Sequence, residues 1–326
     1  MISARNYAAQ AADGIIKTAS LFKDYPKKEF DIKVLEHISA LTKVAIHFAI
    51  PDCGKIFDDK LKGLSGVQVR LPFSAITVEY FVSKDKTIFD EGSEVYSPRR
   101  VCLAVENKVK DIIAFRERTG ADLGFLSKIE DEFAISFSVM YETRSSWKLS
   151  PVTWVMPTTW EYYPSDSMAG PLLATKNEGG ISGGAVISMP GVFDLLCKAH
   201  GAEKTALDAI AYDMHHEINA VMELCEALTC TNVSAKILQD SATESVNAKR
   251  ARKGKVPIYE TRILTIEVPG VAQGSGGKIG DRGAPRQHLR RGHIRRLPDS
   301  RKIWVNSCVV GSLKNGRIDK SYSISH

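Results

Sequence analysis

The chain has 326 residues, of which 44% are hydrophobic and 25% charged, and this composition excludes a mostly disordered protein. Its formal net charge of +6 is unevenly distributed. Residues 245–326 hold 18 Lys and Arg against 5 Asp and Glu, a charge of +13, whereas the rest holds 26 against 33, a charge of −7. A positive C-terminal quarter indicates an anionic partner.

Targeting and redox signals are sparse. Met1–Ala12 lacks the basic region and apolar core of a signal peptide, and no run approaches the roughly 18 apolar residues of a membrane span. Six scattered cysteines without a CxxC pair predict small buried side chains rather than a zinc site or a disulfide framework. We expect a soluble cytoplasmic protein without a membrane association.

The first half of the chain predicts a mixture of helices and strands. Residues 7–22 favour a helix broken at Gly14, and residues 31–50 favour a longer helix that Pro51 ends. A further helix is expected at 108–118. Strands are predicted at 67–70, 75–82, 100–106, 133–142 and 152–157, the last two as neighbours.

The middle of the chain predicts a loop and then two helices. Residues 165–190 are rich in glycine, serine and proline with little periodicity, which is typical of a long loop or linker. Helices are expected at 191–199 and 203–229. The second carries an apolar stripe, so it must pack on another element.

The C-terminal third is expected to be basic and rich in strands. Strands are predicted at 232–238 and 257–268, on either side of a basic segment. Residues 286–297 and 301–310 predict a hairpin with its turn at 298–300. Five arginines and two histidines between Arg286 and Arg296 are more cations than solubility requires.

Together these patterns predict an α+β fold: a mostly antiparallel sheet with helices, a helical middle segment and a basic strand-rich C-terminal module. The expected divisions are an N-terminal α+β region at 1–164, a loop or linker at 165–190, a helical segment at 191–230 and the C-terminal module at 231–326. The strands of that module complete the N-terminal sheet if the module is not independent.

The basic segment and the hairpin form a candidate nucleic-acid surface. Cations that neutralise phosphates release counterions, and aromatic side chains stack on bases. The alternatives are docking on an acidic protein, docking on the acidic remainder of the chain, and binding of a small anion. The expected phosphate contacts are Lys249, Arg250, Arg252, Lys253, Lys255, Arg286, Arg290, Arg291, Arg295 and Arg296, with Tyr259 and Trp304 as stacking platforms.

His288 and His293 raise a second hypothesis, a metal-independent nuclease. Two histidines among cations are able to cleave a phosphodiester by general acid–base catalysis. They lie five residues apart, and an odd separation on a regular strand places two residues on opposite faces. A shared site therefore requires a β-bulge, for which Gly292 is the candidate.

Two further patterns fail as sites. His215, His216 and Glu217 do not match the HExxH zinc motif, because Ala220 occupies the position of the second ligand. The glycine-rich loop 270–280 does not match a phosphate-binding loop, because Ile279 follows Lys278 where Ser or Thr is required. We expect neither a metal nor a cofactor.

Three C-terminal segments carry a resemblance: residues 247–259, the run His-Leu-Arg-Arg-Gly-His-Ile-Arg-Arg at 288–296, and Ile-Trp-Val-Asn at 303–306. They resemble proteins of unassigned activity that bacteriophages and prophages encode, from residue 227 onwards. The resemblance implies a phage setting in the host cell cytoplasm and no catalytic residues. We therefore expect a phage-encoded protein that binds DNA or RNA, with a nuclease, or a protein that binds an acidic host factor of defence or transcription, as alternatives.

Overall fold

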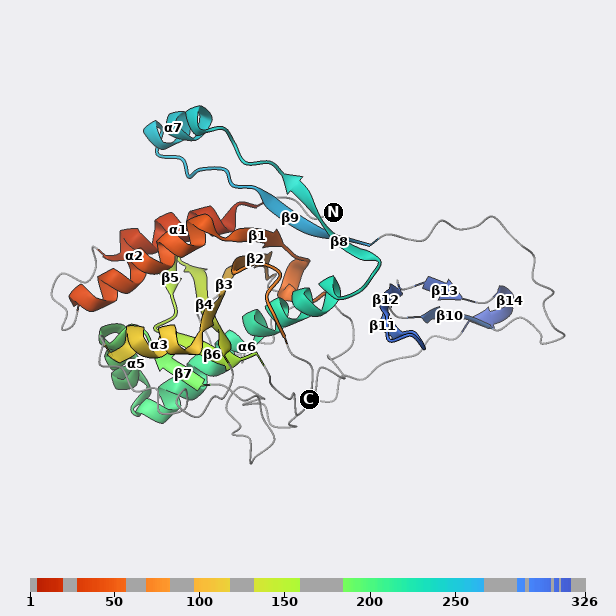
Figure 1. Ribbon diagram of the computed structural model, residues 1–326, viewed down its shortest axis with the longest axis horizontal. Coiled ribbons are helices and arrows are strands. Elements are labelled where there is room, and N and C mark those ends of the chain that lie inside the picture. The colour runs from red at the N-terminus through yellow and green to blue at the C-terminus, as the bar shows by residue number, and fades with distance from the viewer. Residues whose placement is uncertain are drawn as a thin grey trace.

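The computed structural model describes residues 5–19, 28–56, 69–82, 97–117, 132–158, 184–266, 286–290, 293–305, 308–310 and 312–317. Figure 1 shows a sheet with helices on both faces, a helix carried away from the sheet on two extended segments, and a group of C-terminal strands at one end. This arrangement confirms the predicted α+β class.

The described residues build a mixed sheet of nine strands, in the order β7-β6-β4-β3-β2-β1-β9-β8 with β5 beside β4. Among the described strands of this sheet, only β1 pairs in parallel, with β2 and β9, so antiparallel pairing predominates as predicted. The strands are β1 (Ile46–Ala49), β2 (Ala75–Phe81), β3 (Arg99–Lys108), β4 (Phe133–Thr143), β5 (Ser146–Leu149), β6 (Val152–Pro157), β7 (Gly184–Ile187), β8 (Val233–Gln239) and β9 (Thr261–Ile266).

Helices and C-terminal strands complete the described structure. The helices are α1 (Tyr7–Thr18), α2 (Lys28–Val44), the short 3₁₀ helix η2 (Asp52–Gly54), α3 (Val109–Glu117), α5 (Pro190–His200), α6 (Glu203–Leu228) and α7 (Glu244–Arg252). The C-terminal strands are β10 (Arg286–Arg290), β11 (His293–Arg296), β12 (Lys302–Val305), β13 (Cys308–Val310) and β14 (Ser312–Arg317). No described helix is long and apolar enough to cross a membrane.

Both faces of the central strands are buried, which explains their nearly continuous apolar sequence. On β3, Cys102 and Ala104 join a core with the apolar stripe of α6. The alternate residues Val101 and Leu103 join a second core with α1 and α2. The expected packing of the long helix 203–229 is thereby confirmed, since Ile218 is fully buried in the first core.

Two buried carboxylates each hold the start of a helix in place. Glu79 on β2 accepts a hydrogen bond of 3.0 Å from the backbone N–H of Ala8, at the start of α1. Asp31 on α2 accepts one of 3.0 Å from Val192, at the start of α5. The first N–H groups of a helix lack partners within it and favour negative charge, so each carboxylate fixes a helix end to a distant element.

Some sequence predictions were wrong at element boundaries. The expected helix at 31–50 ends at Val44, because β1 pairs with β2 and β9 and this pairing overrides helical spacing. Helix α1 runs through Gly14 without a break, since the glycine packs against Trp147. Of the strand expected at 67–70, residues 69–70 are described and are not strand. Residues 67–68 lie outside the described residues.

The expected linker differs in part from the structure, and the C-terminal module joins the main sheet in part. Within 165–190, β7 pairs with β6 as an edge strand and α5 begins at Pro190, while residues 165–183 lie outside the described residues. Strands β8 and β9 complete the N-terminal sheet through the β9–β1 pairing. Residues 233–239 and 261–266 therefore belong to the main sheet, as the sequence had allowed.

Candidate nucleic-acid interface

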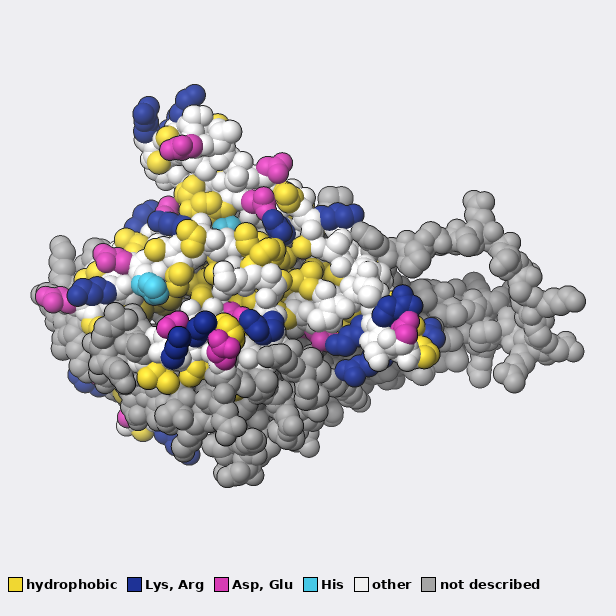
Figure 2. All heavy atoms as spheres, in the orientation of Figure 1, with side chains coloured by type: hydrophobic (Ala, Val, Ile, Leu, Met, Phe, Trp, Pro, Cys, Tyr) yellow, Lys and Arg dark blue, Asp and Glu magenta, His cyan; other side chains and the backbone are white. Residues whose placement is uncertain are grey.

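The predicted basic segment lies in an excursion between β8 and β9, residues 240–260, which we call the basic arm. Figure 1 shows α7 at the outer end of this arm, away from the sheet and from α1 and α2. Helix α7 has no buried residue. The space-filling view shows dark blue side chains at its outer end (Figure 2). The arm therefore presents its cations at a distance from the main body.

One asparagine fastens α7 to the returning segment of the arm. The side chain of Asn247 accepts a hydrogen bond of 2.9 Å from the backbone N–H of Ile258 and donates one of 3.3 Å to the Ile258 carbonyl. It also donates one of 3.2 Å to the carbonyl of Ala242. The side-chain amide thus bonds the backbone N–H and carbonyl of one residue, as the backbone of a paired strand would. These bonds hold the short helix in place without a hydrophobic core.

The end of α7 is closed by a Schellman motif. Gly254 has φ of 65° and its N–H bonds to Ala251, while the N–H of Lys255 bonds to the carbonyl of Arg250, each at 2.9 Å. The Nε of Arg250 donates a hydrogen bond of 2.9 Å to the Val256 carbonyl. Arg250, predicted as a phosphate contact, is therefore committed in part to holding the arm together.

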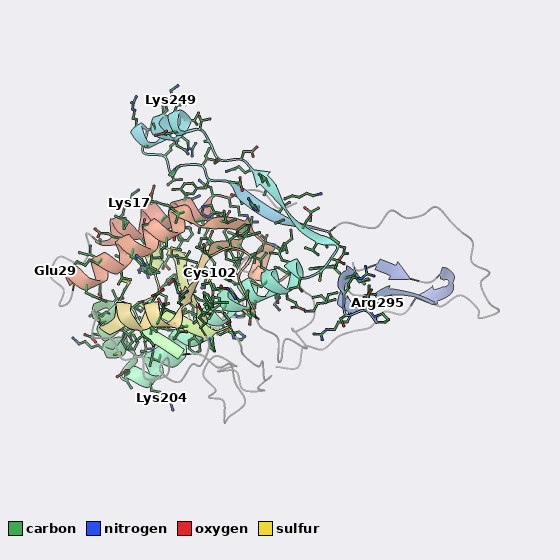
Figure 3. The ribbon with its side chains drawn as sticks, in the orientation of Figure 1. Lys17, Glu29, Cys102, Lys204, Lys249 and Arg295 are labelled. Carbon is green, nitrogen blue, oxygen red and sulfur yellow. The ribbon has the colours of Figure 1, made fainter. Side chains whose placement is uncertain are left out.

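The other cations of α7 share the opposite face. A helix turns about 100° per residue, so Lys249, Arg252 and Lys253 fall within an arc of about 100°, and Arg250 and Asn247 lie outside it. All three cations are exposed, as is Lys255 beyond the helix end. None of these four forms an ion pair with a described carboxylate. Figure 3 places Lys249 at the outer end of the arm.

The predicted C-terminal hairpin is confirmed in its pairing. Strand β11 pairs antiparallel with β12, Ile294 opposite Trp304, and β10 pairs antiparallel with β13, Leu289 opposite Val309. The two partner numbers add to the same value in both pairs, so β10–β13 continues the register of β11–β12. We call these four strands the hairpin. Its turn is closed by a hydrogen bond of 2.8 Å from the N–H of Leu297 to the carbonyl of Arg301.

The hairpin docks on the main body where α6 leads into β8. The N–H of Thr231 donates a hydrogen bond of 2.9 Å to the carbonyl of Lys302, and the side chain of Asn232 bonds to both the N–H and the carbonyl of Trp304. The ammonium of Lys302 lies 2.8 Å from the carboxylate of Glu226, and both side chains are mostly buried. Lys302 is thus a structural cation, and its neighbour Trp304 is anchored through its backbone.

The structure separates the two basic segments instead of joining them. Figure 3 shows Lys249 on the basic arm and Arg295 on the hairpin at widely separated places, and a separation seen in projection is a real one. Arg295 and Arg296 are exposed on β11. The single basic surface that the sequence suggested is therefore two surfaces on different elements.

Tyr259 packs against the main sheet. Its ring stacks on that of His47 with centroids 5.1 Å apart, and Nδ1 of His47 lies 2.7 Å from Oγ1 of Thr77. Burial lowers the pKa of His47 to about 4 and raises that of Tyr259. One face of the tyrosine ring that was expected to stack on bases is thus covered by His47 of the sheet, because burying an apolar ring face is favourable.

Several predicted site residues cannot be placed by their side chains. The backbones of Arg286, His288, Arg290 and His293 are described, but their side chains lie outside the described part, and so does the whole of Arg291. Arg290 pairs with Cys308 and His293 with Val305, so equal numbers of residues intervene on the two strands. This register contains no net insertion that would bring positions 288 and 293 to one face. It gives the nuclease hypothesis no support.

A buried charge cluster was missed by the sequence analysis. Arg100 on β3 lies 3.1 Å from Glu217 and 3.2 Å from Asp213, two carboxylates that are one turn apart on α6. The hydroxyl of Tyr80 donates a hydrogen bond of 2.8 Å to Glu217. Burial raises the pKa of Glu217, with Arg100 acting in the opposite direction. Glu217 is only 1% exposed whereas the side chain of Asp213 is 45% exposed, so the cluster joins α6 to the sheet and reaches solvent at Asp213. An arginine inside the apolar run 100–106 was the available signal.

The described residues contain no further cluster of metal-binding or exposed nucleophilic side chains. They contain no group of three His, Cys, Asp or Glu side chains that could hold a metal ion. Among the described cysteines, Cys102, Cys225 and Cys230 are buried free thiols, and burial raises the pKa of Cys225 to about 12. Comparison of the chain with protein-family models, curated proteins and solved structures found no match. The functional argument therefore rests on the two basic surfaces.

Proposed function

We propose that this protein binds nucleic acid, with the basic arm as the principal contact and Arg295 of the hairpin as a second one. The observation that carries the proposal is the exposed face formed by Lys249, Arg252 and Lys253 on a helix held away from the body. Cations that are accessible and unneutralised are what phosphate groups bind, with the release of counterions.

The basic arm differs from the rest of the surface in its balance of charge. On the main body, several cations have carboxylate partners, as in Lys43 with Asp13 and Lys108 with Glu132. Residues 245–255 contain five cations and no acidic residue. A surface evolved only for solubility mixes both signs.

Helix stability alone does not account for these cations. Basic side chains in the last turn stabilise a helix through its dipole by about 0.3–1 kcal/mol each. Lys249 and Arg252 lie in that turn, but Lys255 follows the helix end and has no such role. A position held away from the body is likewise unnecessary for helix stability and useful for reaching a partner.

The setting that we propose is the cytoplasm of a phage-infected bacterial cell. Its support is the resemblance of residues 247–259 and 288–296 to phage and prophage proteins. An acidic host protein is the alternative ligand of the same cations, and the experiment below separates the two.

The experiment measures the affinity of the full-length protein for labelled nucleic acids at two salt concentrations. One variant carries Lys249→Gln, Arg252→Gln and Lys253→Gln. Its matched control carries Lys33→Gln, Lys148→Gln and Lys204→Gln, which remove three exposed cations from the main body. Glutamine keeps a high helix propensity, and circular dichroism verifies that both variants fold.

We expect the arm variant to weaken binding by at least about tenfold and to reduce the salt dependence by about three phosphate contacts. The control variant should bind within about twofold of the wild type, because its lysines are far from the ligand. Equal losses in both variants would mean that net charge alone attracts the probe. No binding by the wild type at low salt would remove the proposal and favour a protein ligand.

A further inference from the structure

We infer that the ligand of the basic arm is B-form duplex DNA, with α7 entering the major groove. This inference rests on the proposed function and names its ligand. It follows from three features of the arm: the lack of an available aromatic side chain, the shape of its helix, and one exposed apolar residue near its cations.

The arm lacks the groups that hold single strands. Single-stranded nucleic acids are bound by stacking of their bases on aromatic side chains. Between residues 240 and 260 the only aromatic residue is Tyr259, and its ring is stacked on His47 of the sheet. The arm therefore offers cations without a stacking platform, which matches a duplex, where phosphates are dense and bases are already stacked.

The shape of the arm fits the major groove of DNA. Helix α7 has nine residues, none of them buried, and it stands away from the sheet (Figure 1). A helix with its side chains is about 10–12 Å across, and the B-DNA major groove is about 12 Å wide. The major groove of duplex RNA is too deep and narrow for side chains to read, so the same element does not fit it.

An exposed valine lies beside the cations of α7. Val246 is 43% exposed, and its position three residues before Lys249 places it about 60° from that lysine around the helix, at the edge of the cation face. The major groove of DNA is lined by thymine methyl groups, which contact apolar side chains, and uracil lacks this methyl. An exposed apolar residue at the edge of the cation face is thus suited to contact the floor of a DNA groove while the cations bind its phosphates.

The arm is also held in a defined position at its base. The side chain of Asn6 donates a hydrogen bond of 2.8 Å to the carbonyl of Pro257, and that of Gln239 donates one of 3.3 Å to the carbonyl of Tyr259. Together with the Asn247 contacts, these bonds order the arm before a ligand arrives. An ordered element loses little conformational entropy on binding.

The first test compares one sequence of about 20 base pairs, roughly two helical turns, as duplex DNA, single-stranded DNA and duplex RNA. We expect the wild type to bind duplex DNA at least about tenfold more tightly than the other two probes. The Lys249→Gln, Arg252→Gln, Lys253→Gln variant should lose this preference. Equal or tighter binding of single-stranded DNA or of duplex RNA would overturn the inference and leave the proposed function standing. No binding to any probe would overturn both.

The second test replaces every thymine of an A·T-rich duplex by deoxyuridine, which removes the groove methyls and keeps the phosphates. Burial of one methyl corresponds to about 0.8 kcal/mol, so we expect the wild type to lose about threefold to fourfold in affinity. Val246→Ala should show a smaller difference between the two duplexes, because its shorter side chain buries less of the thymine methyl. Equal binding of the two duplexes by the wild type would overturn entry into the major groove.

Discussion

Asn232 binds the backbone of Trp304 as a neighbouring strand would. Its Nδ2 donates a hydrogen bond of 2.8 Å to the Trp304 carbonyl, and its Oδ1 accepts one of 2.7 Å from the Trp304 N–H. The two residues are 72 positions apart, and the pair connects the start of β8 to β12 of the hairpin. One side chain thereby fixes the hairpin to the main body, next to the Lys302–Glu226 ion pair.

The Asn232→Asp substitution should loosen the hairpin without unfolding the protein. The new carboxylate oxygen cannot donate to the Trp304 carbonyl, so that acceptor loses its partner at a cost of about 1–3 kcal/mol. We expect faster amide hydrogen exchange in residues 302–305 and unchanged exchange in β3 and β4. Thr231→Ala is the milder comparison, because it removes only the exposed 3.2 Å hydrogen bond from the Thr231 hydroxyl to the Lys302 carbonyl and keeps the one from the backbone N–H. Unchanged exchange in β12 would show that other contacts hold the hairpin.

The Gly14→Ala substitution should destabilise the protein although it improves helix propensity. A Cβ at Gly14 would lie 2.6 Å from the Cβ of Trp147, an atom that cannot move without its strand. Helix propensity alone predicts a gain of about 1 kcal/mol, whereas overpacking predicts a loss of about 1–3 kcal/mol. Urea unfolding therefore decides between them by its sign. An increase in the free energy of unfolding would contradict the packing explanation.

Regular periodicity explains which elements could be predicted from the sequence. The long helix 203–229 matches α6 because its apolar stripe covers many turns, and the strand 133–142 matches β4 because it alternates. The short strand β1 was missed, because its four residues continue a helical pattern and only pairing with β2 and β9 makes them a strand. Short elements depend on partners that the local sequence does not contain.

The candidate site shows the same limit. Basic residues 249–255 and 286–296 are close in the sequence, and their composition predicted an anionic ligand. Their separation arises because α7 is carried by β8 and β9 while the hairpin docks at the end of α6. The contacts of Asn232 and Asn247 decide these positions, and the sequence around an asparagine does not indicate which distant backbone groups its side chain binds.

Stability should fall as the pH drops from about 6.5 to about 4, because of His47. Its folded pKa is lowered to about 4 by burial, so the folded state binds fewer protons than the unfolded state in this window. The stability is therefore present above pH 6.5 and lost progressively towards pH 4, by at most about 3 kcal/mol. The measurement is the free energy of unfolding across this range.

The His47→Gln variant isolates this contribution. Burial also lowers the pKa of His215 to about 4, and burial raises that of Glu79, which makes stability fall as the pH rises above about 4.5. The difference between variant and wild type removes these other groups. We expect a shallower pH dependence in His47→Gln than in the wild type. Equal slopes in the two proteins would contradict the assignment.

The Arg100→Leu substitution should be the most damaging of these changes, because it leaves the Glu217 carboxylate buried without a cation. Breaking a buried ion pair from one side costs about 3–5 kcal/mol, whereas replacing both partners by apolar residues is often neutral. We therefore expect Arg100→Leu with Glu217→Leu to recover most of the loss in urea unfolding. Lys43→Ala, which breaks the exposed pair with Asp13, should cost less than about 1 kcal/mol. A cost for Arg100→Leu as small as that of Lys43→Ala would contradict this expectation. It would mean that Glu217 takes up a proton when Arg100 is absent, so that no unpaired charge remains buried.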